Sequence, residues 1–147
     1  MHKKFVEGLL AYLLQRASHQ VTSQFHEILK IRDVSKHQWR LLVWLSDGDA
    51  YTVTELAHHL MLEQPAATRL INAAAKDDLV TKTTDAADAR RTLIAISDKG
   101  RSHIARLKED ALVVDRLIAQ RYGQKEVERL KKDLLKLIHR FDNIKRT

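Results

Sequence analysis

The sequence predicts a mainly α-helical fold of the α+β class, in which a helix-turn-helix carries a β-hairpin wing. Two short amphipathic helical patterns in residues 52–77 are followed by two short strand patterns in residues 79–97. Longer amphipathic patterns fill both ends of the chain. Periods of 3.6 and 2 residues distinguish the helices from the strands, and their order along the chain gives the winged arrangement.

The first short helix is expected to begin after Thr52. Glu55 follows three residues later, and this spacing is that of a capping box, in which each side chain satisfies a free backbone donor. The pattern breaks at residues 61–63, and Pro65 marks a new start because proline is tolerated only in the first helical turn. The apolar face at helical spacing consists of Val53, Leu56, Ala57 and Leu60.

The second short helix, residues 64–77, has one apolar and one polar side. The apolar side comprises Ala67, Leu70, Ile71 and Ala74. The polar stripe comprises Gln64, Pro65, Thr68, Arg69 and Asn72. Such a stripe suits base edges and phosphates in a DNA major groove, and the alternative is an ordinary solvated helix face.

The predicted wing consists of residues 79–84 and 92–97, which are rich in β-branched residues and alternate in polarity. Between them lies a charged tip with Asp85, Asp88, Arg90 and Arg91. Two arginines on a loop beside a recognition helix suit phosphates or a neighbouring minor groove. Plain surface charge is the alternative for these arginines.

These segments resemble the MarR family of transcription regulators. Four motifs carry the resemblance: Ser-Lys-His-Gln-Trp at 35–39, Thr-x-x-Glu-Leu-Ala at 52–57, Thr-Arg-Leu-Ile at 68–71, and Asp-Ala-Arg at 88–90 followed by Ile-Ser-Asp-Lys-Gly at 96–100. They occur in the family's order. The chain departs from the family pattern at Asp78, where glycine is usual, and at Lys82, where arginine is common.

The resemblance implies a single-domain chain (1–147) with a DNA-binding winged helix-turn-helix at 35–100 and dimerisation helices at 1–34 and 101–147. It implies a homodimeric, ligand-responsive repressor in the bacterial cytoplasm that binds a palindromic operator in double-stranded DNA. The sign of regulation is not encoded, so an activator is the alternative. The expected DNA contacts are Gln64, Pro65, Thr68, Arg69, Asn72, Lys82, Asp88, Arg90 and Arg91.

The terminal helices support a dimer independently. Helices are expected at about 3–30, after the N-cap Ser35, at 98–121 after the N-cap Ser97, and at 125–144. The apolar residues expected on the second of these helices are Trp39, Leu42, Val43 and Leu45. The stripes of the terminal helices are too wide for one winged body to cover, which favours an isologous interface with a second copy. A monomeric helical bundle is the alternative.

Composition excludes several classes of protein. The net charge of +7 and pI near 9.8 favour an anionic partner such as nucleic acid. The absence of cysteine excludes disulfides, a thiol switch and cysteine-ligated zinc. No apolar run is long enough to span a membrane, and we interpret the N-terminus as a helix, not a signal peptide.

Eight histidines raise the question of a metal or catalytic site. His58 and His59 are neighbours, so on a helix their side chains point about 100° apart and do not share a metal ion. No catalytic triad, phosphate loop or paired-carboxylate motif is present, so we expect no enzyme, cofactor or metal site. The rival hypotheses are a protein–protein interaction module that never contacts DNA and a small enzyme that uses histidines.

The family resemblance also implies an effector cavity between the dimerisation helices and the winged body. A small aromatic or phenolic effector is the expected ligand, held by stacking and by charge. The candidate residues are Arg16, His19, Trp39 and Arg40.

Overall fold

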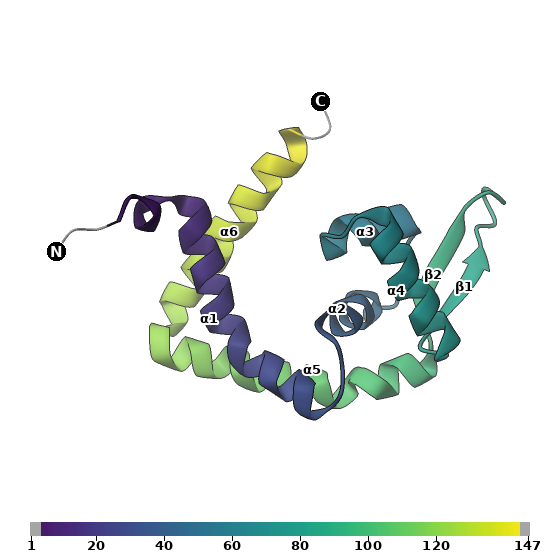
Figure 1. Cartoon of the computed structure of the whole chain (residues 1–147), viewed down its shortest axis with the longest axis horizontal. Coiled ribbons are helices and arrows are strands. Elements are labelled where there is room, and N and C mark those ends of the chain that lie inside the picture. Colours follow the sequence, from purple (N-terminus) through teal and green to yellow (C-terminus); the bar gives the residue numbers. More distant parts are fainter. Residues whose placement is uncertain (1–3, 145–147) are drawn as a thin grey trace. The chain divides into compact units, whose positions relative to one another are not determined.

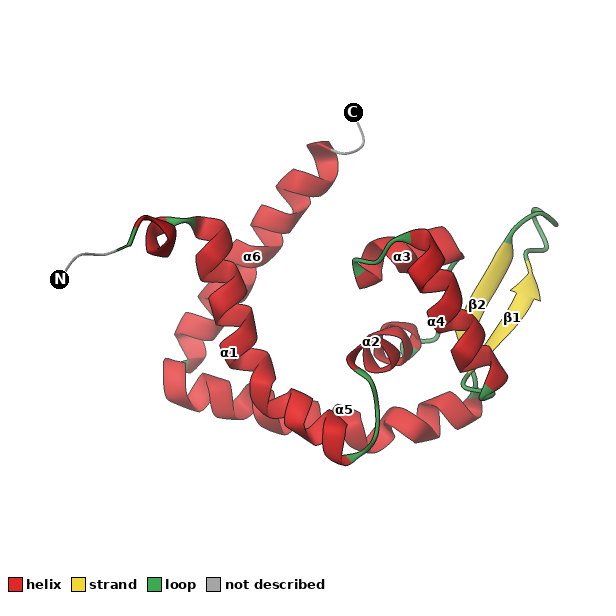
Figure 2. Cartoon of the chain, viewed as in Figure 1, coloured by secondary structure: helices red, strands yellow, loops and turns green. Residues whose placement is uncertain are grey.

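The computed structural model describes residues 4–144, with side chains to residue 142. The elements in chain order are η1 (Phe5–Gly8), α1 (Leu10–Ile31), α2 (Lys36–Leu45), α3 (Val53–Leu60), α4 (Gln64–Lys76), β1 (Val80–Thr84), β2 (Thr92–Ile96), α5 (Asp98–Tyr122) and α6 (Gln124–Ile144) (Figures 1 and 2). The predicted fold class is confirmed. The chain forms two compact units, which meet between Asp110 and Ala111 within α5.

The helix-turn-helix consists of α3 and α4. Thr52 Oγ1 accepts the backbone N–H of Glu55 at 3.3 Å, and Glu55 Oε2 accepts that of Thr52 at 2.8 Å, so the predicted capping box is present. Met61 adopts a left-handed conformation (φ 56°) that ends α3. Pro65 lies in the first turn of α4, where it breaks no helical hydrogen bond.

The wing is an antiparallel hairpin of β1 and β2. Its register pairs Val80 with Ile96 and Lys82 with Ile94. Tyr51 adds a single bridge to Ile94, with backbone hydrogen bonds of 3.0 and 2.7 Å. Because alternate residues of a strand share a face, the buried side chains of Val80, Ile94 and Ile96 fix the side of the hairpin that packs inward.

One apolar core joins α2, α3, α4, the hairpin and the start of α5. Its fully or nearly fully buried members are Leu41, Leu42, Leu45, Leu56, Leu60, Ile71, Ala74, Leu79, Val80, Ile94, Ile96 and Ile104. Leucines dominate the helices and β-branched residues dominate the strands, in line with the propensities of each element. This core holds α4 and the wing in a fixed relation to each other.

A tight junction connects α4, β1 and α5. Asp78 is left-handed (φ 60°), a conformation that aspartate adopts more readily than most residues other than glycine. The Ser97 hydroxyl donates to the Asp78 carbonyl at 2.5 Å and accepts the N–H of Gly100 at 2.9 Å, so Ser97 caps α5 as expected. Lys99 Nζ donates to the carbonyl of Asp77 at 2.9 Å, at the end of α4. Gly100 lies directly against the backbone of Leu79.

The expected N-terminal helix at 3–30 was wrong at its start, and Lys3 lies outside the described residues. A separate 3₁₀ turn, η1, comes first, and Leu9 is extended (φ −80°, ψ 130°) before α1 begins. The Glu7 carboxylate accepts the N–H of Lys4 at 3.0 Å, which closes this turn locally. Gly8 follows, and glycine disfavours helix continuation by about 1 kcal/mol relative to alanine.

Helix α2 begins at the predicted cap, where Ser35 Oγ accepts the N–H of Gln38 at 3.0 Å. Its predicted buried face was incomplete, because Leu41 is fully buried while Trp39 and Val43 are only half-buried. Several consecutive apolar residues leave the phase of a ten-residue helix ambiguous, and packing against α3 and α4 selects Leu41.

The second unit contains the end of α5 and helix α6, which are separated by Gly123 (φ 114°). Lys131 Nζ lies 3.0 Å from Asp115 Oδ2 and joins the two helices. Apolar side chains remain exposed along α6, including Leu130 (43%), Leu135 (56%), Ile138 (52%) and Phe141 (61%). Among the helices that the structure describes, none combines the length and apolarity needed to cross a bilayer.

Candidate nucleic-acid interface

Helix α4 presents the predicted polar stripe to the outside. Gln64, Pro65, Thr68, Arg69 and Asn72 are all exposed. On the opposite side Ala67, Ile71 and Ala74 are buried, and Leu70 is half-buried. The helix therefore packs through small and aliphatic side chains and keeps its hydrogen-bonding groups outward, as a helix that enters a major groove requires.

The wing contacts this stripe through one side-chain pair. Lys82 Nζ, on β1, donates to Asn72 Oδ1, on α4. The two residues are ten positions apart, and the turn at Asp77 and Asp78 brings them together. Sequence reasoning assigned each residue to DNA separately and missed their contact.

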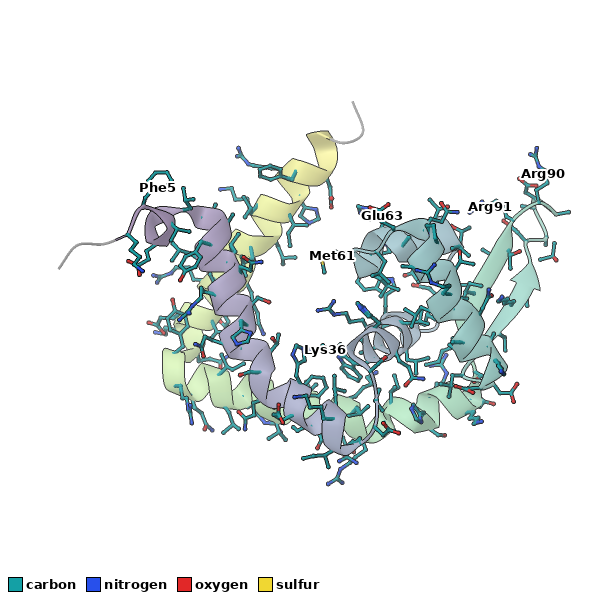
Figure 3. The ribbon with its side chains drawn as sticks, viewed as in Figure 1. Phe5, Lys36, Met61, Glu63, Arg90 and Arg91 are labelled. Atoms are coloured by element: carbon teal, nitrogen blue, oxygen red, sulfur yellow. The ribbon has the colours of Figure 1, made fainter. Side chains whose placement is uncertain are left out.

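Arg90 lies at the far end of the hairpin and projects outward (Figure 3). Its Nε donates to Asp88 Oδ1 at 3.1 Å and its Nη2 donates to Asp88 Oδ2 at 3.3 Å, so the anticipated bidentate pair is present. The hydrogen bonds from Arg90 hold the pKa of the Asp88 carboxyl below its usual value. The Arg90 side chain is nevertheless 91% exposed, so its guanidinium is available to an outside anion.

Arg91 is placed differently, although it is the next residue. Its Nη1 lies 3.5 Å from Asp85 Oδ2, and that carboxylate is only 16% exposed. Arg91 also lies near Glu55, whose pKa is lowered chiefly by the backbone hydrogen bond from Thr52 and further by the charge of Arg91. The two wing arginines therefore differ: Arg90 faces outward, and Arg91 pairs with Asp85 where the tip loop joins the two strands.

A recess of about 380 Å³ lies between the start of α3 and the wing. It is lined by Thr52, Val53, Thr54, Arg90, Arg91 and Thr92. The sequence pattern gave no indication of this recess, because it brings together segments about forty residues apart. Two arginines at its edge give it a positive lining that suits a phosphate backbone.

The four residues expected at an effector site do not form one cluster. Trp39 packs on Phe25 with ring centroids 4.9 Å apart and borders the apolar core. Arg16 lies exposed on α1 and takes part in none of the ion pairs among residues 4–144. His19 and Arg40 both lie close enough to His26 to affect its charge.

His26 was missed as a candidate because nothing but its place on an amphipathic helix distinguishes it in the sequence. Burial lowers its pKa, and the positive charges of Lys36 and Arg40 lower the pKa further. A cavity of about 630 Å³ lies elsewhere, between the end of α1 and α5. Its lining is Ile28, Ile31, Arg32, Val34, His103, Arg106, Leu107 and Asp110, and it includes none of the four expected residues.

Known proteins resemble this chain over nearly its whole length. The transcriptional repressor IacR of Pseudomonas putida is 25% identical over 137 residues, which are 90% of this chain and 80% of IacR. The crystal structure of the MarR family transcriptional regulator SPO1453 from Silicibacter pomeroyi DSS-3 superposes with a TM-score of 0.83 at 29% identity, over 95% of this chain and 99% of that one. The MarR family model matches residues 32–91.

The chain is therefore similar to members of the MarR family. The matched segment extends from just before α2 to the wing tip and so contains α4 and both wing arginines. The fold is also that of the transcriptional repressor CouR bound to a 23-mer DNA duplex, with a TM-score of 0.78 at 22% identity over 94% of this chain and 99% of CouR. These relatives are named as regulators and repressors, not as enzymes.

Among the described residues, no group of three or more histidine, aspartate or glutamate side chains is arranged to hold a metal ion. His59 instead stacks on Trp44 with ring centroids 4.1 Å apart. His58 lies edge-on to His59 at 5.4 Å. These histidines therefore belong to an aromatic cluster on the surface of α2 and α3.

Proposed function

We propose that this protein is a sequence-specific transcription regulator that binds double-stranded DNA as a homodimer and acts as a repressor. The observation that carries the proposal is the exposed polar stripe of α4 held beside a wing whose tip presents Arg90. The relatives named as repressors, and the fold shared with a repressor bound to a DNA duplex, support it. A regulator of bacterial genes works in the cytoplasm, where we place it.

In this proposal α4 enters the major groove and the wing lies over the adjacent minor groove. The contacts that we assign to DNA are Gln64, Pro65, Thr68, Arg69, Asn72, Lys82, Asp88, Arg90 and Arg91. Arg69 and its neighbours on α4 meet base edges or flanking phosphates. Arg90 responds to groove width and charge, and Asp88 orients it.

We assign residues 35–100 to DNA binding and the terminal segments, 1–34 and 101–147, to dimerisation. The apolar side chains exposed at both ends of the chain support this division. Phe5, Leu10 and Leu13 are exposed on η1 and α1, and Leu130 and Phe141 are exposed on α6. Apolar side chains exposed in this way mark surfaces that associate, and a two-fold axis lets a second copy cover each of them.

We further propose that a small aromatic or phenolic effector weakens DNA binding by changing the distance between the two recognition helices. Trp39 supplies an aromatic face, and His19 and Arg40 supply polar and positive groups around His26. Arg16, which is exposed on α1, completes the proposed set. Tryptophan fluorescence during titration with hydroxybenzoates and phenylacetates tests the ligand class directly.

The operator tests the dimeric arrangement. Two recognition helices related by a two-fold axis should protect a palindrome with half-sites about 10 bp apart. Selection of binding sites from random DNA, followed by footprinting, measures that spacing. Saturable binding of one protomer to a single asymmetric half-site would contradict the proposal, and the absence of salt-dependent binding to any DNA would favour a protein–protein module.

Arg90 and Arg91 should respond differently to substitution. Arg90→Ala should weaken binding to operator and scrambled DNA alike and reduce the slope of log affinity against log salt by about 0.9, the loss of one phosphate contact. Arg91→Ala should have the smaller effect on that slope because the Arg91 side chain is 49% exposed, against 91% for Arg90, and is less accessible to a phosphate. Affinities at several salt concentrations provide the measurement.

Two further variants separate charge from geometry at the wing tip. Arg90→Lys keeps the charge but loses the planar fork that Asp88 holds, so it should restore the salt slope without restoring full affinity. Asp88→Ala should resemble Arg90→Ala in a milder form. Equal slopes for wild type and Arg90→Ala on both DNAs would mean that the wing tip does not contact DNA.

A further inference from the structure

One end of the Asn72 side-chain amide, its carbonyl oxygen, accepts a hydrogen bond from Lys82. A lysine ammonium can only donate hydrogen bonds, so the Asn72 atom that faces Lys82 is the carbonyl oxygen Oδ1. The amide nitrogen of Asn72 makes no hydrogen bond to the described residues, and the residue is exposed on α4. The pair therefore presents N–H donors outward from both partners.

The strand register explains why Lys82 reaches α4. Lys82 pairs with Ile94, which is fully buried, and follows the buried Val80 by two residues. Residues two apart share a face of a strand, so Lys82 continues the inward face of the hairpin beyond the edge of the core. From there its long side chain extends along α4 to Asn72. The contact thus depends on the packing of Val80 and Ile94.

The pairing changes what Asn72 can recognise. A free asparagine contacts adenine with both amide ends, accepting from N6 and donating to N7. Here the Lys82 ammonium takes one of the two acceptor positions of Oδ1, and its positive charge repels the amino group of adenine from the other. Guanine presents two acceptors, N7 and O6, on its major-groove edge, and these match a surface made of donors.

Resting on the proposed DNA-binding function, we propose that Lys82 is a specificity-determining residue that directs Asn72 to guanine and away from adenine. Lys82 acts on the base through Asn72, as a positioning residue, and the ammonium adds electrostatic attraction to the acceptors of guanine. A phosphate oxygen would also accept from the same donors. A phosphate contact is the same at every base pair, so measuring the preference among the four bases distinguishes a guanine contact from a phosphate contact.

The test measures affinity for operators that carry each of the four base pairs at every half-site position. The wild type should prefer guanine at one position of each half-site by on the order of tenfold. Lys82→Met should abolish this preference and gain adenine at that position, because both amide ends of Asn72 become free. Lys82→Arg, which still donates to Oδ1, should retain guanine.

A double-mutant cycle assigns the effect to the pair. Asn72→Ala should make the same position indifferent to base identity, and adding Lys82→Met to Asn72→Ala should change no base ranking. Lys76→Met is the matched control, since Lys76 is an exposed lysine near the end of the same helix and makes no hydrogen bond to the described residues. It should lower affinity for all sequences equally.

Three results would overturn the inference. One is a uniform loss of affinity in Lys82→Met with the base ranking unchanged, which would place the pair on a phosphate. Another is an adenine preference in the wild type at the position that Asn72→Ala affects. Failure of the wild type to bind any DNA would instead refute the proposed function, and the inference with it.

Discussion

Replacing Gly100 with alanine should destabilise the winged body, whereas the same change at Gly8 should not. A Cβ atom at Gly100 would lie 2.2 Å from the carbonyl oxygen of Leu79 and 2.8 Å from Cγ1 of Ile96. The first of these contacts is with backbone, which cannot rotate away as a side chain can. Either α5 or the start of β1 has to shift, at a cost of about 1–3 kcal/mol in the free energy of unfolding.

The same glycine lies beside the hydrogen bonds of Ser97 that join the end of α4 to the start of α5. Displacement of α5 would therefore also loosen the connection between the recognition helix and the wing. Gly8→Ala is a suitable control, because a Cβ at Gly8 meets nothing within 4 Å. Urea unfolding followed by circular dichroism measures both variants, and equal midpoints for Gly100→Ala and wild type would contradict the expectation.

Placing charge on the apolar side of α6 should separate the dimer. The double variant Leu130→Asp and Phe141→Asp replaces two apolar side chains, which are 43% and 61% exposed in the single chain, with carboxylates. An aspartate tolerates solvent but not an apolar interface, so the monomer should remain folded while association is lost. Sedimentation velocity should then show a monomer for the variant and a dimer for the wild type.

Loss of the dimer should also lower operator affinity by a large factor. Two linked recognition helices gain about 10²–10⁴ in affinity over one, because the second contact becomes intramolecular. Lys132→Asp is the control, since its position on α6 is turned about 180° from Phe141 and about 160° from Leu130, at about 100° per residue. A wild-type chain that sediments as a folded monomer would show that the exposed face has another role.

The sequence was most informative where local chemistry determines structure. The capping box of Thr52 and Glu55, the cap at Ser35 and the pair between Asp88 and Arg90 involve residues at most three positions apart. Their geometry follows from the backbone alone. The family resemblance supplied the arrangement of the longer elements, including the left-handed residue at Asp78.

Contacts between distant segments were not predictable from the sequence in this way. The bond from Lys82 to Asn72 needs both the strand register and the turn after α4. The burial of Leu41 needs the placement of α3 and α4, because neighbouring apolar residues fit several helix phases equally well. The break at Leu9 was hidden for a different reason: the apolar periodicity continues through Gly8 although the backbone does not remain helical.

The bidentate ion pair between Asp88 and Arg90 also affects the thermodynamics of DNA binding. An arginine loses rotamer freedom when it docks, and fixing such a side chain costs about 0.5–1.5 kcal/mol. Here Asp88 restricts the guanidinium before DNA arrives, so part of that entropy is already lost in the free protein. The carboxylate also reduces the net positive charge at the tip, which weakens long-range attraction to DNA. The wing should thus contribute more to how long the protein stays on its site than to how fast it arrives.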